Sequence, residues 1–211
     1  MKSNCIIFSG ILLLASLISF SQNIPVEVVL SDKDYRYQHF FFKELAPESR
    51  FGFFHTSSMY FFYDEKRKTE MMSQSYLTLD INRSITVLGG TFYANVPGFK
   101  ASGALQYKYV KDNLFVLVAP RIDLWKDPSY ELFTLAEYRP PISKRLSLYT
   151  RVQTMSNFSQ ARHNRSYQNV RLGVGNKYTQ AGLALNYDQY GSEVSTVMSM
   201  GVFLRHSLGN K

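Results

Sequence analysis

Between Arg50 and Arg205 the chain divides into ten short segments, and the gaps between them alternate in length. The longer gaps are 64–73, 94–98, 125–129, 156–165 and 188–193, and the short ones are 83, 111–113 and 176–177, with 139–144 as the exception. An up-and-down antiparallel sheet produces this rhythm when tight turns lie at one end and longer loops at the other. The pattern therefore predicts a meander of about ten strands, in a range of roughly 8–12.

Most of these segments alternate between an apolar and a polar face. In 166–175, Leu172 and Val174 share one face, while Asn169 and Arg171 share the other. A period of two is the mark of a strand with two different surroundings. A soluble sandwich would alternate in the same way, with its polar face in water. In a barrel that crosses a membrane, the polar faces would instead line the interior.

The N-terminus has the features of an export signal. Lys2 precedes the uncharged apolar run 6–20, and Ser19 and Ser21 provide small residues at its end. We therefore expect 1–21 to be a cleaved signal peptide. The run has fifteen residues, fewer than the ~20 that a membrane-spanning helix needs. Cys5 is the only cysteine and would leave with the signal, so the mature chain would have no disulfide.

An exported chain without disulfides needs another source of stability, and closing a barrel in lipid satisfies every strand edge. The 31 Phe and Tyr residues suit aromatic girdles at two membrane interfaces. With the loop rhythm and the alternation, the chain resembles the small outer-membrane β-barrel proteins of Gram-negative bacteria. The resemblance covers about 50–205. It implies an all-β, antiparallel up-and-down transmembrane barrel, located in the outer membrane with its short turns in the periplasm.

The residues on either side of 50–205 are expected to lie outside the barrel. In 22–49, the stretch 26–30 reads as a short strand and the aromatic stretch 34–45 as a helix that ends before Pro47. This segment is predicted to be a periplasmic lead-in packed at the barrel mouth or, alternatively, a plug that enters the lumen. Residues 206–211 are expected to form a C-terminal tail.

The polar faces of the predicted strands carry charges of both signs. Pointed inward together, they form a set that we call the predicted lumen network: Asp80, Lys100, Lys108, Arg121, Asp123, Glu131, Glu137, Arg145, Arg151, Arg171 and Arg205. Buried charges must be paired, so one interpretation is a salt-bridged, filled interior. The other is a narrow pore that favours anions, because six of the seven basic residues lie from Lys108 onward.

One pattern suggests an enzyme. His55 and Ser57 lie two apart on one strand face, where an imidazole could take the hydroxyl proton. The pair resembles the His-x-Ser pair of outer-membrane lipid A deacylases, which implies a lipid-modifying hydrolase. In that family an acid orients the histidine, and here Glu65 or Glu70 would have to do so from the next loop. An ordinary strand histidine is the competing interpretation.

Partners and ligands are less clearly indicated. In the predicted outer loop 156–165, Arg162, His163 and Arg165 form a cationic group able to contact anionic sugar phosphates. The net charge of +8 is therefore assigned to outer-membrane lipid and lipopolysaccharide, and not to nucleic acid, since no recognition motif is present. The four histidines lack ligand spacing, so neither a metal nor a cofactor is expected.

These observations predict a non-enzymatic barrel with a structural, adhesive or accessory role, with another protein of the envelope as a candidate partner. The first alternative is a narrow pore for a small anionic or hydrophobic solute. The second is the lipid hydrolase that uses His55 and Ser57.

Overall fold

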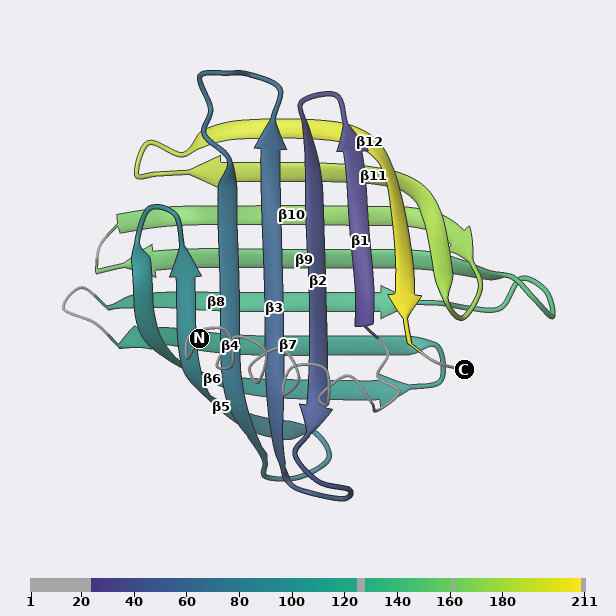
Figure 1. Ribbon diagram of the computed structural model, residues 1–211. Coiled ribbons are helices and arrows are strands. Elements are labelled where there is room, and N and C mark those ends of the chain that lie inside the picture. Colours follow the sequence, from purple (N-terminus) through teal and green to yellow (C-terminus); the bar gives the residue numbers. More distant parts are fainter. Residues whose placement is uncertain (1–23, 125–127, 161, 210–211) are drawn as a thin grey trace, which may run out of the picture.

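The computed structural model describes residues 24–124, 128–160 and 162–209. They form 12 antiparallel strands that close into one barrel, in which each strand pairs with its neighbours in sequence and β1 pairs with β12 (Figure 1). The strands are β1 (Ile24–Ser31), β2 (Asp34–Glu44), β3 (Phe51–Phe62), β4 (Glu70–Asp80), β5 (Ile85–Ala94), β6 (Gly98–Lys111), β7 (Leu114–Leu124), β8 (Ser129–Tyr138), β9 (Ser147–Ser159), β10 (Arg162–Gly175), β11 (Thr179–Tyr190) and β12 (Ser195–Leu208). The signal peptide predicted for 1–21 lies outside the described residues.

The closed sheet places the two predicted faces on the inside and the outside. Arg171 and Asn169 are each 2% exposed, whereas Leu172 on the same strand is 51% exposed. Leu183 on β11 and Val202 on β12 are likewise exposed. The outer surface is thus apolar and the interior is polar, which is the reverse of a soluble sandwich and the arrangement of a barrel in lipid.

The barrel has two different ends. We call the end that contains the first residue of β1 and the last residue of β12 the terminal end. The opposite end is called the loop end. In Figure 1 the strands β1–β4 cross in front of β8–β10 at a steep angle, as expected when strands tilt by about 35–45° on opposite walls. Of the described residues, none belongs to a helix long and apolar enough to cross a membrane.

The N-terminal segment is where the prediction was wrong. The stretch 34–45 is not a helix, and the described part of the segment, 24–49, is neither a lead-in nor a plug, because β1 and β2 are strands of the barrel wall itself. The short strand predicted at 26–30 is confirmed, since it lies within β1. These two strands raise the count from about ten strands to 12. The alternation of β2 is hidden because both of its faces are aromatic: Tyr37 lies on the outward face and Phe40 on the inward face.

The strands also extend further than predicted. The expected outer loop 156–165 is almost entirely strand, since β9 continues to Ser159 and β10 begins at Arg162. In the same way, β12 runs through the expected tail as far as Leu208. The connection between β9 and β10 is therefore short, and the predicted rhythm of tight turns at one end and longer loops at the other is not kept, because the longest connection, 139–146, lies at the terminal end.

Candidate functional site

The lumen is the part of the barrel where charged side chains converge. Those that form ion pairs there gather in three groups, one at the terminal end and two at the loop end. Each arginine among them contacts a carboxylate from its own or another strand.

The first group, which we call the terminal-end cluster, is built around Glu27 on β1. Its Oε1 atom accepts a hydrogen bond from Arg151 Nη2 at 2.6 Å and another from Arg171 Nε at 3.0 Å. All three side chains are at most 2% exposed. Because a buried charge is costly unless it is paired, this shared carboxylate is what allows two arginines from β9 and β10 to lie inside the wall.

A second carboxylate, Glu137 on β8, extends the terminal-end cluster. It pairs with Arg205 from β12 and with Arg139, and the Tyr149 hydroxyl donates to it at 3.1 Å. Arg205 also donates to the Tyr149 oxygen at 2.5 Å. The cluster therefore joins β1, β8, β9, β10 and β12 through side chains alone.

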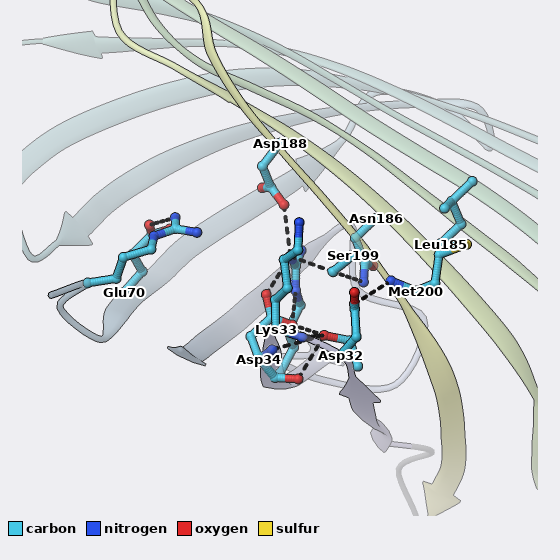
Figure 2. A network of polar contacts seen from close by, with 12 residues as sticks. Asp32, Lys33, Asp34, Glu70, Leu185, Asn186, Asp188, Ser199 and Met200 are labelled. Atoms are coloured by element: carbon cyan, nitrogen blue, oxygen red, sulfur yellow. Dashed lines mark hydrogen bonds and ion pairs between the residues drawn. The ribbon is translucent and has the colours of Figure 1, made fainter. Parts of the chain in front are cut away.

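The second group, the loop-end cluster, begins at Arg36 on β2. Its Nη2 atom donates to Asp34 and to Asp188, each at 2.8 Å. Both carboxylates are 0% exposed. Figure 2 shows Asp188 approaching this contact from β11, with Asn186 and Ser199 beside it. One guanidinium thus ties two strands on either side of the β1–β12 seam.

The loop-end cluster then crosses the lumen. Arg165 on β10 donates to Asp188 at 2.8 Å and to Glu70 on β4 at 2.6 Å. In the strand order of the barrel, β4 and β10 are six steps apart in either direction, so they lie on opposite walls. The contact between Glu70 and Arg165 is therefore a bridge across the bore.

The third group lies on β6, β7 and β8. Arg121 donates to Asp123 at 2.8 Å and to Glu131 at 2.7 Å and 3.1 Å, a two-pronged contact. The Ser129 hydroxyl donates to Asp123 at 2.5 Å, and Lys100 lies 4.0 Å from the same carboxylate. Bidentate pairing of this kind fixes the arginine in one orientation.

A cavity of about 10 Å³, the space of about one water molecule, lies between the terminal-end and loop-end clusters, lined in part by Glu27, Arg36, Tyr60, Asn169 and Arg171. Three buried lining atoms have no hydrogen-bond partner among the described residues: Glu27 Oε2, Arg36 Nη1 and Asn169 Oδ1. A polar cavity with such atoms is suited to ordered water.

The structure gathers most, but not all, of the predicted lumen network. Arg145 lies exposed in the connection between β8 and β9, outside the lumen. Asp80 accepts a hydrogen bond from Thr86 at 2.5 Å. Within the described part of the chain, Lys108 forms no ion pair. The other members are those placed in the clusters above.

Four carboxylates of the clusters were missing from the predicted network: Glu27, Asp34, Glu70 and Asp188. Two of them lie in the N-terminal segment that was read as a lead-in, and the other two were assigned to loops. They pair with arginines, so the basic surplus that suggested an anion-favouring pore is offset inside the lumen.

The predicted outer-loop cation group is divided by the structure. Arg165 points into the lumen, as described above, and was wrongly assigned to a loop. Arg162 is exposed at the loop end. His163 is held by two contacts, with the Gly191 carbonyl at 2.9 Å and the Ser166 hydroxyl at 2.8 Å.

His55 and Ser57 face outward from β3, and neither is hydrogen-bonded to the other. The His55 Nδ1 atom lies 2.9 Å from the Ser75 hydroxyl on β4, and Ser57 donates to the Met72 carbonyl at 3.1 Å. Glu70, a predicted acid for this histidine, is engaged inside the lumen by Arg165. In the described ranges, no three His, Cys, Asp or Glu side chains form a group that could hold a metal.

No protein-family model and no curated sequence matches the chain. Solved structures do. The KdgM porin matches with a TM-score of 0.52 at 13% identity, over 88% of this chain and 99% of that one. The NanC porin matches with a TM-score of 0.52 at 9% identity, over 89% and 100%. A KdgM porin in complex with disordered oligogalacturonate matches with a TM-score of 0.51 at 12% identity, over 88% and 99%. The chain therefore has the fold of outer-membrane β-barrels.

Proposed function

We propose that the chain is a narrow pore of the outer membrane that is closed at rest by ion-paired side chains. The carrying observation is the bridge between Glu70 on β4 and Arg165 on β10, which joins opposite walls across the bore. A lumen that needed only filling could be packed with apolar side chains, since buried ion pairs add little net stability over such packing. Ion pairs whose members can exchange partners are better suited to a lumen that opens.

Further features support this proposal. The apolar outer wall fits lipid, and the similarity to KdgM and NanC covers nearly the whole length of those porins. The polar cavity beside Arg36 has room for about one water molecule. Arg162 is exposed at the loop end. The expectation that this end contacts lipopolysaccharide phosphates is therefore retained. Because the lumen charges pair, the geometry supports a small polar solute and assigns no preferred sign.

Planar-bilayer conductance tests the proposal. The wild-type protein should give small, rare openings, and Glu70→Gln should open more often because the bridge to Arg165 is lost. Arg165 keeps Asp188 as a partner in this variant, so the barrel should stay folded. Glu193→Gln, an exposed carboxylate at the same end, is the matched control and should behave as wild type. Openings that are equally frequent in all three proteins would count against the gate.

The second candidate function is a structural, adhesive or accessory barrel that works with another envelope protein. The filled lumen favours it, since the terminal-end cluster buries Glu27, Arg151 and Arg171 almost completely. This candidate replaces the pore if correctly folded protein, wild type and Glu70→Gln alike, conducts nothing. A hydrolase is the least supported of the three, because His55 and Ser57 form hydrogen bonds with β4 and not with each other.

A further inference from the structure

One sector of the outer wall is polar where the rest of a lipid-facing wall would be apolar. Six outward side chains make up this sector, which we call the outer-wall patch: His39, His55, Ser57, Ser73, Ser75 and Thr91. The strand register makes it continuous, because His39 is opposite Ser57, His55 is opposite Ser75, and Ser75 is opposite Thr91. The patch therefore spans β2 to β5.

The two imidazoles lie together at its centre. The ring centroids of His39 and His55 are 5.3 Å apart. His55 is satisfied by Ser75, but the buried Nδ1 atom of His39 has no hydrogen-bond partner among the described residues. His39 lies near the middle of β2, away from both membrane surfaces. The Nδ1 atom is enclosed, so a partner outside the barrel would reach the half-buried ring through its other nitrogen, Nε2, which also has no hydrogen-bond partner among the described residues. A polar atom left unpaired at that depth in lipid is costly.

Other parts of the wall are less polar, although Gln168 near the middle of β10 also faces outward and is exposed. On β10, β11 and β12 the corresponding outward positions are Leu172, Leu183 and Val202. Where hydroxyls do face outward on β8 and β9, Thr134 and Thr154 bond to each other at 2.7 Å. Those strands can face hydrocarbon without leaving a polar group unpaired at these positions.

Aromatic rings flank the patch. Tyr37 lies 5.5 Å from His39, Phe41 lies 5.8 Å from His55, and Phe41 lies 5.6 Å from Phe53, all between ring centroids. Aromatic side chains around a small polar centre are typical of protein interfaces.

We infer that the outer-wall patch is a contact surface for a second copy of this chain within the membrane, an inference that rests on the membrane location proposed above. A neutral imidazole and a hydroxyl can each donate and accept a hydrogen bond. Two copies related by a two-fold axis along the membrane normal bring the same patch face to face, so each copy supplies the partners that the other lacks. Lipid chains offer no such partner.

Disulfide trapping in isolated outer membranes tests this contact. Ser73→Cys is placed in a Cys5→Ala background, which removes the only native cysteine, and the membranes are treated with a mild oxidant. Leu183→Cys, exposed on β11, is the matched control. A dimer of twice the chain mass from Ser73→Cys and none from Leu183→Cys is the expected result. Adding His39→Leu and His55→Leu to Ser73→Cys should lower the dimer yield several-fold, while the heat-dependent gel shift of a folded barrel remains.

Three results would overturn the inference: only monomer from Ser73→Cys, equal dimer from both cysteine positions, or a product whose mass shows a different protein. Fractionation comes first, because it tests the proposed membrane location separately from the contact surface. A chain absent from the outer-membrane fraction contradicts the proposed function as well, whereas a monomer found in that fraction contradicts the contact surface alone.

Discussion

Glu27 on β1 and Arg151 on β9 meet at 2.6 Å although four steps of the barrel wall separate their strands. Both side chains are almost fully buried. The contact therefore spans part of the interior, and with Arg171 it ties the seam of the barrel to β9 and β10. Strand number and shear set the width of a barrel; within it, ion pairs between distant strands lie beside a small apolar cluster of Val29, Tyr149, Ala184 and Phe203.

Glu27→Gln should destabilise the barrel strongly, because it leaves Arg151 and Arg171 without the carboxylate that they share. Removing one partner of a buried ion pair costs about 3–5 kcal/mol. The measurement is the urea midpoint of unfolding in lipid vesicles, followed by the loss of the heat-dependent gel shift. Glu44→Gln, an exposed carboxylate on β2, is the control. Equal midpoints for the two variants would show that Glu27 does not support the terminal-end cluster.

Gly173→Ala should also destabilise, for a steric reason. A Cβ atom at Gly173 would lie 2.2 Å from the Ala181 carbonyl oxygen on the paired strand, which is backbone and cannot rotate away. Overpacking of this kind costs about 1–3 kcal/mol. Gly89→Ala is the control, since a Cβ there meets nothing within 4 Å. The same urea unfolding experiment compares them, and a Gly173→Ala midpoint at the wild-type value would contradict the close approach of β10 and β11.

The fold could be predicted where one face of a strand is apolar and the other is not. For β10, the alternation of Asn169 and Arg171 with Leu172 gave the correct inside and outside, and the predicted export signal with the high aromatic content indicated an outer-membrane barrel, whose fold the chain has. The alternation of faces failed to predict β2, where Phe40 and Tyr37 are aromatic on opposite faces and the period of two disappears. The prediction failed again near Arg165, because a run of polar residues at the end of a strand resembles a loop.

The pairing inside the lumen could not be predicted from the sequence. Charged residues on polar faces were found because they interrupt apolar alternation, as Arg121 and Glu131 do. Which carboxylate meets which arginine depends on closure between β1 and β12, and local sequence does not encode that register. The outer-wall patch was missed for the same reason, since His39 and His55 become neighbours only when β2 joins the sheet.

Leu183→Arg tests which face of the barrel meets lipid. Leu183 is 65% exposed near the middle of β11, so an arginine there would lie in the hydrocarbon layer and should cost about 2–4 kcal/mol. Gln180 is an unsuitable control, because it is 3% exposed and a new charge in the filled lumen would itself be costly. Leu208→Arg is better matched: it changes the same residue type on the outward face, at the end of β12, where the cost should fall to about 0–1 kcal/mol. Folding yield into vesicles and the urea midpoint should both drop for Leu183→Arg and change little for Leu208→Arg. If the two arginines are equally well tolerated, the outer wall does not face lipid, and the chain is a soluble barrel with the same strand order.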